Sequence, residues 1–346
     1  MGGERQRWKN AAAPPRHLLL LAMSAVLAAL SCTAAADARP AGTLPLREVA
    51  RVPLPGPAVR FDYTSVDPAT NRLWIAHMDA GQLLAFDVVR RRIVGTIAAP
   101  GVHGVIVVPA LHRVYASATD DHEVLTLDSR TGAVLARAPA GQYPDGLAYD
   151  PVEHHVFVSD ESGGVETVLS ATGHRIATIP LHGEAGNVQY DAGSGHILAD
   201  VQTANQLAVI DPRTNRVLRR INLPGCAHDH GLLVDSAHRL AFVACDGNAR
   251  LLTVDLDSMK VTHTFPVGDS PDVLALDSGL RRLYVSAESG VVAVFAETRH
   301  GAKPLGRAPL ADEAHTVAVD QRTHLVYFPL QSGSTGSPQL LIMRPT

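Results

Sequence analysis

Short apolar stretches with the two-residue alternation of β-strands recur along this 346-residue chain. Seven of these stretches resemble one another and read FDYTSVD, HGVIVV, DGLAYD, GNVQYD, HGLLVD, DVLALD and HTVAVD. They end at Asp67, Val108, Asp150, Asp191, Asp235, Asp277 and Asp320, at steps of 41, 42, 41, 44, 42 and 43 residues. A steady period of this length is typical of repeat folds in which each copy forms one supersecondary unit.

Three further strand-like runs follow most of these copies, with turn residues between them. The first full copy continues with RLWIAHM, QLLAFDV and RRIVGTI, whereas the last has only HLVYFP and PQLLIMR. A spare strand-like stretch at 44–54 precedes the first copy and can complete the last. We therefore predict an all-β fold at 44–346, a seven-bladed β-propeller of four-stranded blades closed by the N-terminal strand, which leaves no open sheet edge.

The repeats also carry a family resemblance. The opening FDYTSVDPATNRLWIAH, the second-copy GVHGV, the strand RRLYVSA and the hairpins FDVVRRRIVGTI and IDPRTNRVLRRI resemble those of bacterial YncE-like, YVTN-repeat propellers. The likeness extends over essentially the whole chain from about residue 44. It implies a propeller fold and secretion, and single-stranded DNA binding has been proposed for one branch of such proteins.

The N-terminal region has the features of a secretory signal. Four basic residues precede and flank an apolar run from Leu18 to Leu30, and small residues follow it. We predict a signal peptide at 1–36, a linker at 37–43 and a periplasmic or secreted protein. A membrane-spanning helix would need about 20 apolar residues, more than this run offers, and we expect no transmembrane segment in the mature chain. A lipid anchor at Cys32 is the weaker alternative.

Composition and charge narrow the choice of partners. The chain is 46% hydrophobic and 18% charged, as is ordinary for a globular protein. Its formal charge is −4, and loss of 1–36, with four basic residues and Glu4, would take it to −7. Duplex DNA binding is not expected, because no long basic run is present to contact phosphates. A small polar ligand or a protein partner fits better, and the oligomeric state stays open.

One position in each repeat, five residues before its end, carries residues suited to chemistry. This ring position reads Asp62, His103, Asp145, Gly186, His230, Asp272 and His315. The symmetry of a propeller places these residues around the central channel on one face, where imidazoles and carboxylates can bind a divalent or transition metal ion.

We predict His103, His230 and His315 as metal ligands and catalytic candidates. Asp62, Asp145 and Asp272 are predicted ligand-binding residues. Polar residues at this place can also merely cap turns or bind water.

Two cysteines remain beyond the predicted cleavage site. Cys226 begins the segment Cys-Ala-His-Asp-His, and Cys245 ends the second strand of the same repeat. Antiparallel neighbours bring the start of one strand beside the end of the next, so we predict a disulfide that holds His228, a further ligand-binding candidate. In the competing interpretation, the two thiols are soft ligands for copper or zinc beside His228 and His230.

These observations favour a secreted binding propeller that holds a metal ion or small polar ligand at its channel mouth and presents loops to a partner. The first alternative is a metal-dependent, lactonase-like hydrolase or lyase in which one histidine acts as general base. The second alternative is single-stranded DNA binding.

Overall fold

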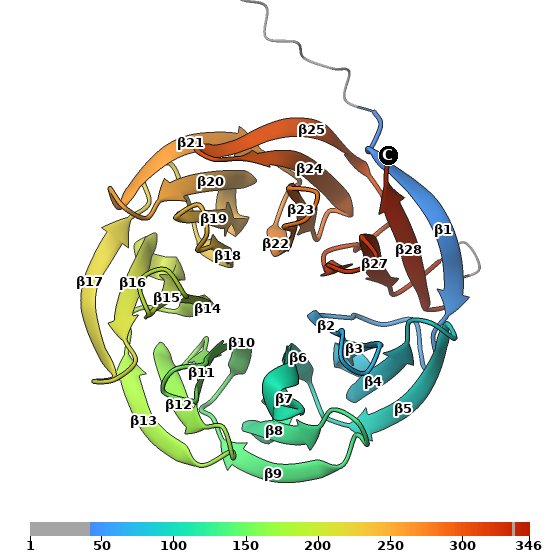
Figure 1. The fold of residues 1–346 in the computed structure, drawn as a ribbon, viewed down its shortest axis with the longest axis horizontal. Coiled ribbons are helices and arrows are strands. Elements are labelled where there is room, and N and C mark those ends of the chain that lie inside the picture. The colour runs from blue at the N-terminus through green and yellow to red at the C-terminus, as the bar shows by residue number, and fades with distance from the viewer. Residues whose placement is uncertain (1–41, 334–335) are drawn as a thin grey trace, which may run out of the picture. The chain divides into compact units, whose positions relative to one another are not determined.

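A ring of seven four-stranded antiparallel sheets surrounds a central channel (Figure 1). The structure is a computed structural model that describes residues 42–333 and 336–346. The predicted all-β, seven-bladed propeller is confirmed. The predicted signal peptide at 1–36 lies outside the described residues.

Each of the first six blades follows chain order from the innermost strand outward. The first two blades are β2 (Thr64–Asp67), β3 (Arg72–His77), β4 (Gln82–Asp87), β5 (Arg92–Ala98), and β6 (Val102–Val108), β7 (Arg113–Ala118), β8 (Glu123–Asp128), β9 (Val134–Pro139). The third and fourth are β10 (Pro144–Asp150), β11 (His155–Asp160), β12 (Val165–Ser170), β13 (Arg175–Pro180), and β14 (Ala185–Asp191), β15 (His196–Val201), β16 (Gln206–Asp211), β17 (Arg216–Asn222). The fifth and sixth are β18 (Asp229–Asp235), β19 (Leu240–Cys245), β20 (Arg250–Asp255), β21 (Lys260–Pro266), and β22 (Pro271–Asp277), β23 (Arg282–Ala287), β24 (Val291–Thr298), β25 (Gly301–Pro309).

The seventh blade joins the two ends of the propeller. It consists of β26 (Ala318–Asp320), β27 (Leu325–Leu330), β28 (Gln339–Pro345) and β1 (Leu46–Pro53). β1 pairs antiparallel with β28, so that Leu46 lies opposite Pro345 and Pro53 opposite Gln339. Closure by the N-terminal strand is therefore confirmed.

Short 3₁₀ helices occupy several of the turns. Those among the described residues are η1 (Met78–Ala80), η2 (Pro109–Leu111), η3 (Thr119–Asp121), η4 (Gln202–Ala204) and η5 (Asp246–Asn248). No helix in 42–333 or 336–346 is long and apolar enough to cross a membrane.

The hydrophobic core lies between neighbouring blades. Trp74 of the first blade is fully buried in one cluster with Val114 and Leu125 of the second blade. Each such large side chain contributes about 1.5–3 kcal/mol on burial. Every blade is thus stabilised by its neighbours, as the repeat pattern predicts.

Polar side-chain contacts join successive blades where the inner strands end. Arg239, which precedes β19, contacts both carboxylate oxygens of Asp191 at the end of β14, at 2.8 and 2.6 Å. His324, which precedes β27, lies 2.9 Å through Nδ1 from Asp277 at the end of β22. The recurring Asp of the repeats therefore also serves the contact between blades, besides capping its own turn.

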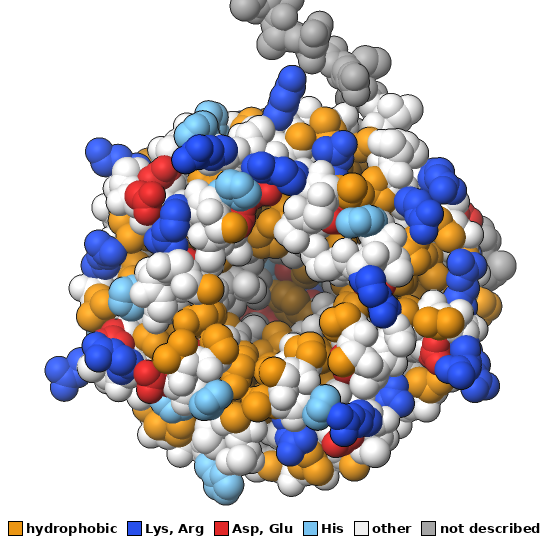
Figure 2. Space-filling model, viewed as in Figure 1, with side chains coloured by type: hydrophobic (Ala, Val, Ile, Leu, Met, Phe, Trp, Pro, Cys, Tyr) orange, Lys and Arg blue, Asp and Glu red, His pale blue; other side chains and the backbone are white. Residues whose placement is uncertain are grey.

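The channel opens as a hollow at the centre of the face drawn in Figure 2. Hydrophobic side chains surround this hollow, and lysine and arginine side chains lie mainly toward the rim of the ring. A cavity of about 270 Å³ there is lined by inner-strand residues such as Val105, Leu147, Leu274 and Val319.

Candidate functional site at the channel mouth

The ring residues leave the regular strand pairing before they reach the channel. The register of the inner strands is irregular between Val102 and Val105, Pro144 and Leu147, Ala185 and Val188, Asp229 and Gly231, and Pro271 and Leu274. Each interval contains the ring position of its blade. A β-bulge frees a residue from the ladder and redirects its side chain, so these bulges turn the ring residues toward the channel mouth.

A cavity of about 400 Å³ occupies that mouth. Its walls include most of the predicted site residues, namely Asp62, His103, Asp145, His228, His230 and Asp272. The remaining lining residues are Arg60, Tyr63, Met78, Tyr143, Glu161, Gln202, Asp246, Ser270, Pro271 and Glu288. Six of the predicted site residues thus line one cavity at the channel mouth, and this cavity is rich in carboxyl groups.

Two glycines bring histidine and aspartate of successive blades together. A Cβ at Gly231 would lie 2.0 Å from the backbone oxygen of Asp272, and one at Gly104 would lie 2.1 Å from that of Asp145. Only glycine tolerates such an approach of a neighbouring backbone. His230, just before Gly231, consequently lies against Asp272.

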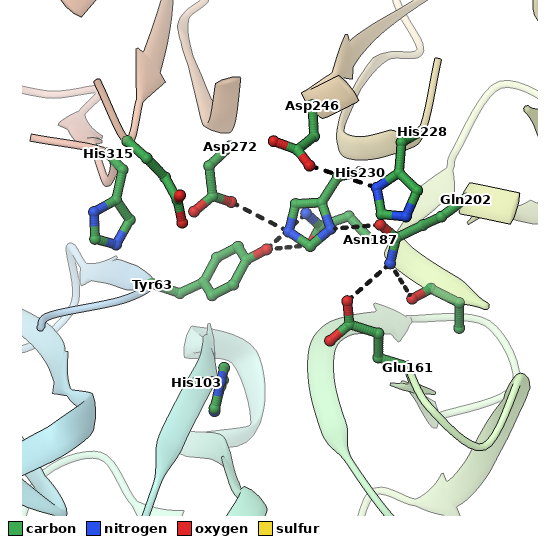
Figure 3. Close-up of polar contacts among 12 residues, drawn as sticks. Tyr63, His103, Glu161, Asn187, Gln202, His228, His230, Asp246, Asp272 and His315 are labelled. Atoms are coloured by element: carbon green, nitrogen blue, oxygen red, sulfur yellow. Dashed lines mark hydrogen bonds and ion pairs between the residues drawn. The ribbon is translucent and has the colours of Figure 1, made fainter. Parts of the chain in front are cut away.

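His230 contacts a carboxylate on one side and an amide on the other (Figure 3). Its Nε2 lies 3.4 Å from Oδ1 of Asp272, and its Nδ1 lies 3.2 Å from Oε1 of Gln202. Burial alone would lower the pKa of His230, but the hydrogen bond and charge of Asp272 raise it well above its ordinary value. In the same pair, burial would raise the pKa of Asp272, and His230 holds it below its ordinary value.

Gln202 fixes the hydrogen that His230 carries on Nδ1. The amide nitrogen of Gln202 donates to Oε1 of Glu161 at 3.0 Å and to the carbonyl oxygen of Ala185 at 2.8 Å. Its Oε1 can therefore only accept, and Nδ1 of His230 donates to it. Gly186 makes room for this side chain, because a Cβ there would lie 3.2 Å from Cγ of Gln202.

Asp62, Asp272 and His315 form the group best suited to a cation. One potential ligand atom from each lies within 4.8 Å of the others, and all three residues are buried. Burial and the charges of Asp272 and Asp145 raise the pKa of Asp62 well above its ordinary value. A bound cation would relieve this repulsion between carboxylates.

His315 faces backbone oxygens through both ring nitrogens. Nε2 lies 2.8 Å from the carbonyl oxygen of Phe61, and Nδ1 lies 3.0 Å from that of Glu313. A carbonyl oxygen only accepts, so each contact uses a hydrogen on the ring nitrogen that makes it. His315 could coordinate a metal only by releasing one of them.

His103 lies apart from the His230–Asp272 pair (Figure 3). Its Nδ1 donates to the carbonyl oxygen of Gly101 at 2.7 Å, and its Nε2 is hydrogen-bonded to the hydroxyl of Tyr143 at 2.8 Å. Both nitrogens are thereby occupied. The three-histidine metal set remains a prediction, whereas the ligand atoms that converge here belong to Asp62, Asp272 and His315.

Arg60 is the fixed cation of the mouth. Its guanidinium donates to Oε1 of Glu288 at 2.7 Å, and Nη2 lies 3.7 Å from Oδ2 of Asp272. Asp272 therefore has positive neighbours from the first and fifth blades. Six carboxyl side chains line the cavity against Arg60 and His230, so the site favours cations.

A hydrogen bond joins the first and fourth blades across the channel. The Tyr63 hydroxyl, from the first blade, lies 2.9 Å from Oδ1 and 2.6 Å from Nδ2 of Asn187, from the fourth blade. Tyr63 also borders the cavity on the opposite face. Tyr63 therefore contributes to the walls of both cavities.

The predicted disulfide Cys226–Cys245 is confirmed, with Cα atoms 5.4 Å apart. It anchors the loop that carries His228 into the mouth cavity. His228 lies 3.5 Å from carboxylates of Glu184 and of Asp246. The bridge rules out the alternative in which the thiols are free metal ligands.

A second convergent group, Asp235, His238 and Glu297, lies away from the mouth, at the far end of β18. Nδ1 of His238 contacts Oδ2 of Asp235 at 2.5 Å, and Nε of Arg281 lies 3.8 Å from Glu297. Two basic groups therefore already face its two carboxyl groups.

Sequence reasoning missed several residues that complete the site, although an available signal marks them. The position two residues before the ring position contributes Arg60 and Tyr143 to the cavity, besides the predicted His228. The position after the ring position contributes Tyr63, which bonds to Asn187 at the same position of the fourth blade. The same internal alignment of repeats, extended by a few residues, identifies these rings. Gln202, on η4, lies outside them and carries no such signal.

Comparison with known proteins supports the fold alone. No family model and no curated protein matches the chain. Among solved structures, it is similar to Kuenenia stuttgartiensis hydrazine synthase, with a TM-score of 0.68 and 13% identity. The likeness covers 77% of this chain and 91% of that one, and at such low identity it supports the propeller architecture alone.

Proposed function

We propose that this protein is a secreted binding propeller whose channel mouth holds a divalent cation. The observation that carries the proposal is the convergence of Asp62, Asp272 and His315 from three blades, with ligand atoms within 4.8 Å of one another. The surplus of carboxyl groups in the cavity favours a cation over an anion or a neutral ligand. The same surplus argues against single-stranded DNA at this mouth.

The donor set indicates the kind of cation. Asp62 and Asp272 offer carboxylate oxygens, whereas His315 must first release a carbonyl. Oxygen-rich sites suit hard cations such as Mg²⁺, Ca²⁺ and Mn²⁺. We therefore expect Mn²⁺ to bind, with the two carboxylates supplying most of the affinity.

Titration calorimetry with Mn²⁺ tests this proposal. Asp62→Asn and Asp272→Asn should each weaken binding by about tenfold or more, equivalent to roughly 1.4 kcal/mol. Glu161→Gln removes a carboxylate of the same cavity outside the convergent group, and it should stay within about threefold of the wild type. Equal affinity in all four proteins would overturn the proposal.

A metal-dependent hydrolase or lyase is the second candidate. The His230–Asp272 pair beside the convergent group is the observation that favours it. Because the pKa of His230 is raised, its imidazole would act as a proton donor at neutral pH rather than as the general base expected from the sequence. A panel of lactones and esters with Mn²⁺ tests this, and an unchanged rate in His230→Gln would argue against it.

Location and family membership are part of the proposal. The disulfide supports an oxidising compartment, and the basic and apolar pattern at 1–36 supports export. The repeat residues support membership among YncE-like propellers. Mass analysis of protein recovered from the periplasm or medium would show whether cleavage occurs after residue 36.

A further inference from the structure

Asp145 is a buried carboxylate that faces the mouth cavity without a hydrogen-bond donor. The residue is 4% exposed, and its Oδ1 has no hydrogen-bond partner among the described residues. It lines the cavity together with Glu161. Burial raises the pKa of Asp145 and is also the main cause of the raised pKa of Glu161, to which the charge of Asp145 adds.

Two neighbouring donor side chains are committed elsewhere. His103 donates to Gly101, and Gln202 uses both amide hydrogens on Glu161 and Ala185. Neither side chain therefore donates a hydrogen bond to Oδ1 of Asp145.

The two cations of the cavity are engaged as well. His230 contacts Asp272 and Gln202, and Arg60 contacts Glu288 and Asp272. An unpaired buried acceptor is costly, so a ligand that brings a hydrogen-bond donor is favoured here.

An ammonium group suits this place better than a metal ion. The convergent groups among the described residues include neither Asp145 nor Glu161, so a metal here would lack a protein ligand set. Metal ions need several ligand atoms at about 2.0–2.6 Å. An ammonium carries three N–H donors that reach separate acceptors at ordinary hydrogen-bond distances of about 2.7–2.9 Å.

We propose that Asp145 and Glu161 form a second subsite of the mouth, which binds the protonated amino group of a small primary amine. This inference rests on the proposed function, because it specifies part of the ligand that the mouth accepts. The ammonium donates to the carboxyl group of Asp145 and to that of Glu161. A cavity of about 400 Å³ accommodates a compact aliphatic amine.

Calorimetry with butylamine and 1,4-diaminobutane, each compared with the alcohol of the same shape, tests the subsite. At least one amine should bind and its alcohol should not. Asp145→Asn should weaken amine binding by about tenfold or more, and Glu161→Gln should weaken it as well. The matched control is Asp120→Asn, an exposed carboxylate on η3, which should bind like the wild type.

Three results would overturn the inference. The first is no amine binding at about 10 mM, a concentration at which a charge-assisted pair is measurable. The others are equal binding of the alcohol and wild-type affinity in Asp145→Asn. Thermal unfolding of each variant verifies that it is folded, and Glu161→Gln provides a second readout should Asp145→Asn misfold. Mn²⁺ titration separates the two proposals. Amine binding without Mn²⁺ binding would overturn the metal site alone, and the reverse would overturn the amine subsite alone.

Discussion

His230 and Asp272 form a contact across the boundary between the fifth and sixth blades, with Nε2 3.4 Å from Oδ1. The second imidazole nitrogen is hydrogen-bonded to Gln202, and the pKa of His230 is raised. His230 is therefore a cation and has no free lone pair to offer a metal ion. Asp272 also belongs to the group that converges with Asp62 and His315. The positive charge of His230 therefore competes with any metal ion for Asp272.

Replacing His230 with glutamine should strengthen Mn²⁺ binding. The variant removes a positive charge next to Asp272, and we expect an affinity gain of about threefold to tenfold at neutral pH. The measurement is calorimetric titration, with His122→Gln, a histidine outside the cavity lining, as control. Were His230 a ligand, as expected from the sequence, the affinity would fall instead.

Glu166 should make stability depend on pH. Burial raises the pKa of this carboxyl to about 8, and the hydroxyl of Ser159 donates to it at 3.0 Å. A folded pKa above the unfolded value of about 4.3 means that its contribution is complete at low pH and is lost as the pH rises through about 8.

The neutral variant Glu166→Gln should consequently be more stable than the wild type at pH 7, by about 1–2 kcal/mol, with the advantage vanishing near pH 4. Urea unfolding at several pH values measures this difference. A constant difference across that range would contradict the raised pKa. Ser159→Ala controls for loss of the hydrogen bond alone.

Loss of the Cys226–Cys245 bridge should cost stability and disturb the mouth. A loop closed by residues 19 apart contributes about 3 kcal/mol in the chain-entropy account. We expect the double serine variant and the reduced wild type each to lose this much free energy of unfolding. Both should therefore unfold at a lower denaturant concentration than the oxidised wild type. If reductant left the unfolding midpoint of the wild type unchanged, the bridge would not stabilise the fold.

Arg239→Ala should loosen the junction between the fourth and fifth blades. It removes both contacts to Asp191 and leaves a buried carboxylate without its partner, at a cost of about 2–3 kcal/mol. Arg239 holds the pKa of Asp191 below its ordinary value despite burial, so this stabilisation is lost as the pH falls through that pKa. Chemical unfolding compares this variant with Arg219→Ala, an exposed arginine on β17, which should cost little.

The architecture could be predicted from the sequence because a propeller repeats one local pattern. Alternation and turn residues locate each strand, and the missing strand of the last repeat identifies the role of residues 46–53. The ring position was also found, because equivalent residues of equivalent blades face the same axis. The Cys226–Cys245 pairing followed from the geometry of adjacent antiparallel strands.

The contacts within the mouth could not be predicted in this way. Arg60 reaches Glu288 across 228 positions, and Tyr63 reaches Asn187 across 124. These pairs depend on bulges and on the close packing at residues such as Gly231, which shift side chains by amounts that an alignment of repeats does not contain. Internal symmetry predicts which residues approach the axis, and the departures from symmetry decide which of them meet.

The pairing of β1 with β28 makes completion of the ring a late event in folding. Its partners are separated by almost the entire described chain, so their encounter has the highest loop-closure cost of any pair among the described strands. Until it occurs, β1 and β28 each present a bare hydrogen-bonding edge to other molecules. In a circularly permuted chain that makes these two strands a local hairpin, refolding should therefore be faster. Concentration-dependent aggregation during refolding should decrease as well.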